Sequence, residues 1–180
     1  MNVFNLAIAS AIVLSSCSEE AGFPELKPGT YYLEIFNDKG EKVLTRRGEA
    51  IGLGSYSQIR FEDPEFITKY SESPYATFAY LLLTTGNENE VWDQGKLWPM
   101  NSQSQAMLNQ HYYNLHGDWA YENVSGELVI TESTARLLKG YFTMSMTVLP
   151  IDSKWGIRWS VNPQWGEHII VKGYFESRGW

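Results

Sequence analysis

The chain has 180 residues, of which 43% are hydrophobic and 19% charged, and its formal net charge is −7. The hydrophobic content excludes a wholly disordered chain, and the negative charge argues against nucleic acid or an anionic lipid surface as the main partner. The single cysteine leaves none for an internal disulfide or a thiolate metal site. The sequence assigns no cofactor, metal or catalytic residue.

A short apolar run, residues 6–14, stands near the N-terminus and leads to that cysteine. It is too short to cross a bilayer core, which takes about 20 apolar residues, but it has the length of a signal-peptide core. A helix buried in the fold is the alternative. Leu14-Ser15-Ser16-Cys17 resembles the lipobox of bacterial lipoprotein signal peptides, in which Leu and two small residues precede Cys. The one departure is that residues 1–5 contain no Lys or Arg.

The resemblance to lipoproteins implies a location for the chain. It implies that a signal peptide of residues 1–16 is removed and that the sulfur of Cys17 carries a diacylglyceryl group, which anchors the protein in a membrane of the bacterial envelope. Residues 17–29 then form the lipidated cysteine and a tether, and residues 30–180 form a single β-rich domain. Ser18 resembles the sorting signal for the outer membrane, and residues 18–20 resemble an acidic tag for the cell surface. The expected location is therefore the outer membrane, on its periplasmic face or at the cell surface.

The domain opens with patterns typical of strands. Alternation from Thr30, followed by the turn residues 37–40 and by Val43 and Leu44, predicts a β-hairpin. Residues 48–54 are predicted to form a glycine-rich loop. A second alternating stretch begins at Ser57 and should end at Asp63-Pro64.

The middle of the chain is more ambiguous. Residues 66–73 are expected to contain a short helical turn, and the apolar run 77–85 fits either a buried strand or a helix, of which we favour the strand. Residues 86–90 are polar and predict a loop. Residues 99–114 are the best helix candidate, because Ser102 is a suitable cap and apolar residues follow it at helical spacing.

The C-terminal part alternates most clearly, over residues 138–148, 157–161 and 169–175. Lys139-Gly140-Tyr141-Phe142 recurs as Lys172-Gly173-Tyr174-Phe175, with each Phe and Gly on the predicted core face. Glycine on an inner face marks a bulge or a close backbone approach, and two copies on antiparallel neighbouring strands would explain the repeat. Residues 126–142 and 169–175 resemble β-sandwich or calycin-like lipoprotein domains of unknown function. The predicted fold is mainly β, an antiparallel β-sandwich or calycin-like barrel with one short helix.

Two kinds of residue are candidates for function. Tryptophans in predicted loops or at the chain end offer flat rings for a sugar, a peptide or a headgroup, although packing in the core is the alternative; they are Trp92, Trp98, Trp155, Trp165 and Trp180. Histidines and carboxylates form the second group, namely His111, His116, Asp118, the acidic loop near Asp93, and the distant His168. These side chains are candidates for a hydrolase or a metal site, but we favour the alternative that they are ordinary solvated or hydrogen-bonded side chains.

These observations leave two functions open. The first is a non-catalytic binding or interaction module, held at the membrane by the lipid on Cys17, whose partner is an envelope protein, a glycan or a small apolar ligand. The alternative is a small periplasmic or surface hydrolase that uses the groups near residues 111–118.

Overall fold

The computed structural model describes residues 25–53, 57–69, 74–85, 92–100, 105–109, 119–134, 136–149 and 160–178. Cys17 and the apolar run before it lie outside these ranges. The described strands are β1 (Thr30–Phe36), β2 (Lys42–Leu53), β3 (Gln58–Glu62), β4 (Tyr80–Thr84), β5 (Leu97–Pro99), β6 (Ala106–Asn109), β7 (Ala120–Thr134), β8 (Leu137–Val148) and β9 (His168–Arg178). The only helices in these ranges are α1 (Phe66–Lys69) and a 3₁₀ turn at Pro74–Ala76. None of these has the length and apolar content needed to cross a membrane.

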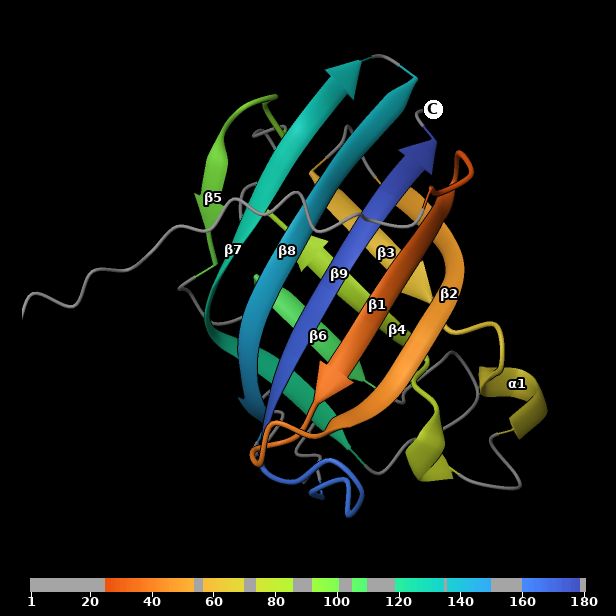
Figure 1. Ribbon diagram of the computed structural model, residues 1–180, viewed down its shortest axis with the longest axis vertical. Helices are drawn as coiled ribbons and strands as arrows, with labels where there is room; N and C mark the ends of the chain where they lie inside the picture. The colour runs from red at the N-terminus through yellow and green to blue at the C-terminus, as the bar shows by residue number, and fades with distance from the viewer. Residues whose placement is uncertain are drawn as a thin grey trace, which may run out of the picture.

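The strands close into an antiparallel eight-stranded barrel (Figure 1). Around the ring, each strand pairs with the next in the order β1, β2, β3, β4, β6, β7, β8 and β9. Strand β9 then pairs with β1 and completes the ring. Strand β5 pairs with residues 127–129 of β7, beyond the segment of β7 that pairs with β6. The mainly β prediction is confirmed, and of its two architectures the structure is the calycin-like barrel.

Alternation of side chains places the core inside the barrel. Along β1 and β3, every second residue is buried, as a period of two requires when one face of a strand points inward. The ring of Phe61 lies 5.5 Å from the rings of both Phe142 and Phe175, measured between centroids. These phenylalanines, from β3, β8 and β9, join opposite walls of the barrel across its interior.

The repeated sequence forms a reciprocal pair between β8 and β9. Gly140 lies opposite Phe175, and Phe142 lies opposite Gly173, so each phenylalanine ring covers the glycine of the other copy. A Cβ atom added to Gly173 would stand 2.6 Å from Cζ of Phe142. The predicted antiparallel pairing and close inner-face approach of the repeat are both confirmed.

Two predicted elements are wrong. Residues 48–53 continue β2 instead of forming a glycine-rich loop, because Gly48 lets the strand pass close to the Glu62 carbonyl and the Tyr31 ring. The helix predicted over 99–114 is also wrong in the part that is described. Residues 106–109 form β6, whose backbone pairs with β4 on one side and β7 on the other. These ladder hydrogen bonds override the weak local helix preference.

Candidate functional site

The predicted tryptophans are the first candidates, and two of them, Trp92 and Trp98, lie near the C-terminal end of β7. Trp92 and Trp98 are 1% and 6% exposed, and their rings meet edge to face with centroids 4.9 Å apart. Ser133, near the end of β7, donates a hydrogen bond to the carbonyl of Trp92. The Lys96 ammonium lies 3.7 Å from the centroid of the Trp98 ring. This pair packs into the core at that end.

A second tryptophan pair lies at the opposite end, near the start of β7. Trp119 and Trp165 have ring centroids 4.5 Å apart, and both side chains are buried. Tyr121 packs against them and donates a hydrogen bond to the Gly166 carbonyl. The buried amide of Asn162 holds the same loop by donating to the Tyr75 carbonyl.

Burial corrects the exposure expected for the tryptophans. The rings of Trp92, Trp98 and Trp165 are buried against other aromatic rings, since Trp92 and Trp98 pack on each other and Trp165 packs on Trp119. No acceptor among the described residues pairs with the indole N–H groups of Trp92, Trp98, Trp119 and Trp165. Trp155 and Trp180 lie outside the described residues. A surface of exposed rings is therefore not formed by these three side chains.

The predicted acid-base candidates do not assemble into a site where they are described. Asp93 is exposed near the Trp92 end, whereas His168 is exposed at the start of β9, opposite Thr147 at the other end. Within the described ranges, no group of three His, Cys, Asp or Glu side chains is placed to hold a metal ion. His111, His116 and Asp118 fall outside those ranges.

The most buried ion pair ties the helical segment to the barrel wall. The carboxylate of Asp63, whose side chain is 0% exposed, accepts hydrogen bonds from Nε of Arg46 at 3.0 and 3.1 Å. It also accepts the backbone N–H groups of Glu65 and Phe78. Burial raises the pKa of Asp63, while these donors oppose that shift. Because its acceptor positions are used by the protein, this pair is a structural anchor.

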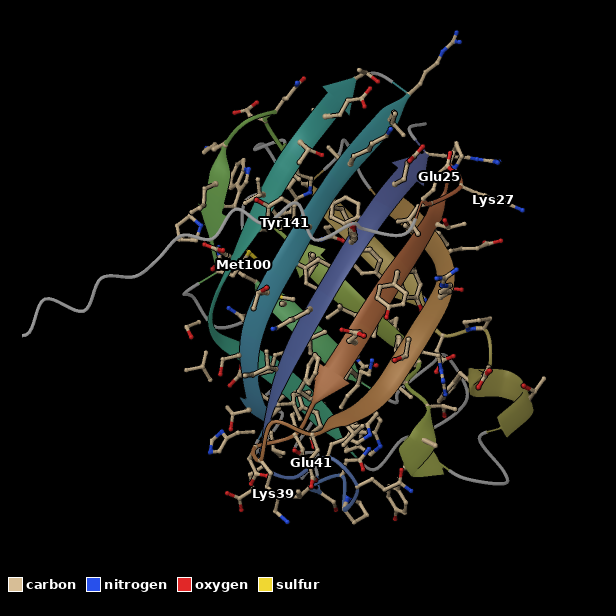
Figure 2. All side chains as sticks on the ribbon, viewed as in Figure 1. Glu25, Lys27, Lys39, Glu41, Met100 and Tyr141 are labelled. Carbon is tan, nitrogen blue, oxygen red and sulfur yellow. The ribbon has the colours of Figure 1, made fainter. Side chains whose placement is uncertain are left out.

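A shallow pocket of about 210 Å³ lies on the outer face of β8 and β9. Tyr141, which is labelled in Figure 2, stands opposite Tyr174 on these strands, and the two line the pocket together with Leu26. Tyr174 is 8% exposed although it is on the outer face, and burial raises its pKa to about 12. The segment before β1 therefore packs against the barrel wall.

A larger pocket of about 410 Å³ lies beside it, where β1 begins. Because β1 starts only at Thr30, the ends of β2 and β9 approach each other beyond it, with Ile51 paired to Arg178. The segment before β1 crosses this junction and leaves a hollow, which we call the 27–30 pocket. It is lined by Lys27, Pro28, Gly29, Thr30, Glu49, Ala50, Ile51, Gly52 and Arg178.

Charged side chains surround the 27–30 pocket. Arg178 donates from Nε to the Pro28 carbonyl, and its Cγ lies 3.1 Å from the position that a Cβ of Gly29 would take. Gly29 has φ +86°, a conformation that suits glycine, so a larger residue would be strained and would displace the arginine. Within the described ranges, neither Lys27, nor Glu49, nor the Nη atoms of Arg178 form an ion pair.

The sequence did not reveal this pocket. Its residues come from three distant segments, which were interpreted as a tether, a glycine-rich loop and the end of a strand. Only the register that brings residue 51 beside residue 178 places them together. Comparison of the chain with protein-family models, with curated proteins and with solved structures gives no match.

Proposed function

We propose that this protein is an envelope lipoprotein, anchored through Cys17, whose barrel is a non-catalytic module that binds a partner on its outer surface. The anchor is supported by the order of Leu14-Ser15-Ser16-Cys17, which is that of a lipobox. One structural observation supports the outer surface as the binding part: among the described residues, buried side chains of the barrel's own strands meet across its interior. Eight-stranded barrels have interiors that are either packed in this way or hollow enough for one small ligand.

The packing of the interior is dense where it is described. Phe61, Phe142 and Phe175 meet at the centre, and a tryptophan pair lies toward each end. Two pockets lined by described residues lie where the N-terminal segment crosses the outside of the barrel. A glycan or an envelope protein is therefore favoured over a small apolar ligand in the interior.

Fatty-acid labelling in bacteria tests the anchor. Cys17→Ala should abolish incorporation of the label and leave an uncleaved precursor, whereas Ser18→Ala keeps the acceptor sulfur and should be labelled normally. Normal processing of Cys17→Ala would contradict the proposal.

A second experiment tests where the partner binds. Native mass spectrometry of the protein purified from the envelope should find no apolar ligand at one copy per chain. Glycan arrays and pull-downs from envelope extract should yield a saturable partner. An apolar ligand released only on unfolding, or no binding in either assay, would contradict an outer-surface module.

A further inference from the structure

The 27–30 pocket combines two cations with one carboxylate. Lys27 and Arg178 supply positive charge, and Glu49 supplies negative charge, all on the lining of one pocket of about 410 Å³. A ligand that pairs with all three side chains has a negatively charged group and a positively charged group within one small molecule. A purely anionic ligand would gain from the lysine and arginine but would face repulsion from the glutamate.

The 27–30 pocket also offers hydrogen-bond donors that suit an anion. The Arg178 side chain is exposed, lies against Gly29 and donates from Nε to the Pro28 carbonyl, which leaves its Nη donors for a ligand. Guanidinium groups bind phosphate through paired, charge-assisted hydrogen bonds. Because the arginine is already positioned, little conformational entropy is lost on binding.

The place of the pocket in the chain brings it close to a membrane. Cys17 stands ten residues before Lys27, and ten residues reach at most about 35 Å when fully extended. In Figure 2, Glu25 and Lys27 lie at one end of the barrel, and Lys39 and Glu41 lie at the opposite end. The end that carries the pocket is thus the end that a lipid on Cys17 would hold near the bilayer.

We propose that the 27–30 pocket binds the zwitterionic phosphoethanolamine headgroup of a membrane lipid, with the phosphate on Lys27 and Arg178 and the ammonium on Glu49. The inference rests on the proposed anchor for its choice of a membrane lipid. A primary ammonium donates hydrogen bonds to a carboxylate, whereas the quaternary ammonium of choline has no N–H to donate. Ethanolamine should therefore be preferred over choline.

Calorimetry on the full chain, purified unacylated in a non-ionic detergent, tests the pocket without the anchor. Glycerophosphoethanolamine should bind saturably, and Lys27→Gln or Arg178→Gln should weaken binding about tenfold, the effect of losing one charge-assisted contact. Lys39→Gln is the matched control, since it removes an exposed lysine at the far end, and it should bind as the unmodified chain does. Glu49→Gln should remove the preference over glycerophosphocholine.

Several results would overturn the proposal. They are the absence of saturable binding, equal binding by Lys27→Gln and Lys39→Gln, and equal affinity for inorganic phosphate. Lys27 is exposed, so its variant tests the pocket even if Arg178→Gln unfolds.

A second measurement distinguishes a membrane lipid from a free phosphate ester. Lipidated protein is placed in nanodiscs of phosphatidylethanolamine or phosphatidylcholine and treated with an amine-reactive reagent. The extent to which the reagent modifies Lys27 is then measured by mass spectrometry relative to Lys39. Lys27 should be protected only in phosphatidylethanolamine, and equal reactivity in both would overturn the membrane lipid as ligand. Loss of the anchor would appear separately, in the fatty-acid labelling of Cys17.

Discussion

The repeated glycines of β8 and β9 offer the sharpest test of the packing. Gly140→Ala places a methyl group against the carbonyl oxygen of Val129, and Gly173→Ala places one 2.6 Å from Cζ of Phe142. Overpacking of a well-filled core costs about 1–3 kcal/mol. Gly140→Ala should lie at the upper end of that range, because the obstacle is a backbone carbonyl within a strand ladder and cannot rotate away.

The assay is equilibrium urea unfolding followed by tryptophan fluorescence, supported by thermal melts. For a domain of this size, the expected loss lowers the melting temperature by about 2–12 °C. Gly40→Ala is the control, since Gly40 has φ +77° but no atom within 4 Å of an added Cβ, and it therefore reports backbone strain without a clash. Phe142→Leu should partly rescue Gly173→Ala, because it removes the ring atoms that the methyl group meets.

The double-mutant cycle makes this reasoning refutable. Contacting residues couple by about 0.5–3 kcal/mol, whereas independent sites add. Strict additivity of Gly173→Ala and Phe142→Leu, or stability of both glycine variants within about 0.5 kcal/mol of the unmodified chain, would refute the close packing of the repeat.

Three further predictions concern polar groups of the described core. Arg46→Met leaves the buried Asp63 carboxylate without its cation and should cost about 3 kcal/mol in urea unfolding, whereas Lys42→Met at an exposed ion pair should cost much less; equal losses would contradict the structural role of Arg46. Asn123→Leu strips hydrogen bonds from the Met100 carbonyl and the Ala106 N–H and should cost about 2 kcal/mol or more, and an unchanged urea midpoint would argue against this bridge. Burial raises the pKa values of Tyr31, Tyr121 and Tyr174, the last to about 12, so the native state keeps protons that the unfolded chain loses above about pH 10. Stability should be retained below that pH and fall as the pH rises above it, and titration of every tyrosine near pH 10 without unfolding would contradict this burial.

The strands were predictable where alternation was regular. Residues 30–36, 138–148 and 169–175 repeat apolar side chains with a period of two, and each lies in a strand with that face inward. The glycines of the repeat were also interpretable, since an inner-face glycine opposite an aromatic residue has a simple steric meaning. The lipobox motif is read in the same local way, from four consecutive residues.

Other features depended on partners far away in the chain. Residues 106–109 include the good helix formers Ala106, Met107 and Leu108, and only the ladders of β4 and β7 make them a strand. Trp92, Trp98 and Trp165 stand in stretches whose sequence is typical of loops, yet Trp98 lies in β5 and all three rings are buried against other aromatic rings.

The β class and the inward faces of the main strands follow from the sequence alone, because each depends on neighbours within a few residues. Only the tertiary structure decided that the sheet closes into a barrel, since closure depends on the pairing of β1 with β9, which lie at opposite ends of the domain. The same long-range register joins Lys27, Glu49 and Arg178 around one pocket. No local sequence pattern predicts that these three residues lie close together, because their proximity depends on the geometry of the closed sheet.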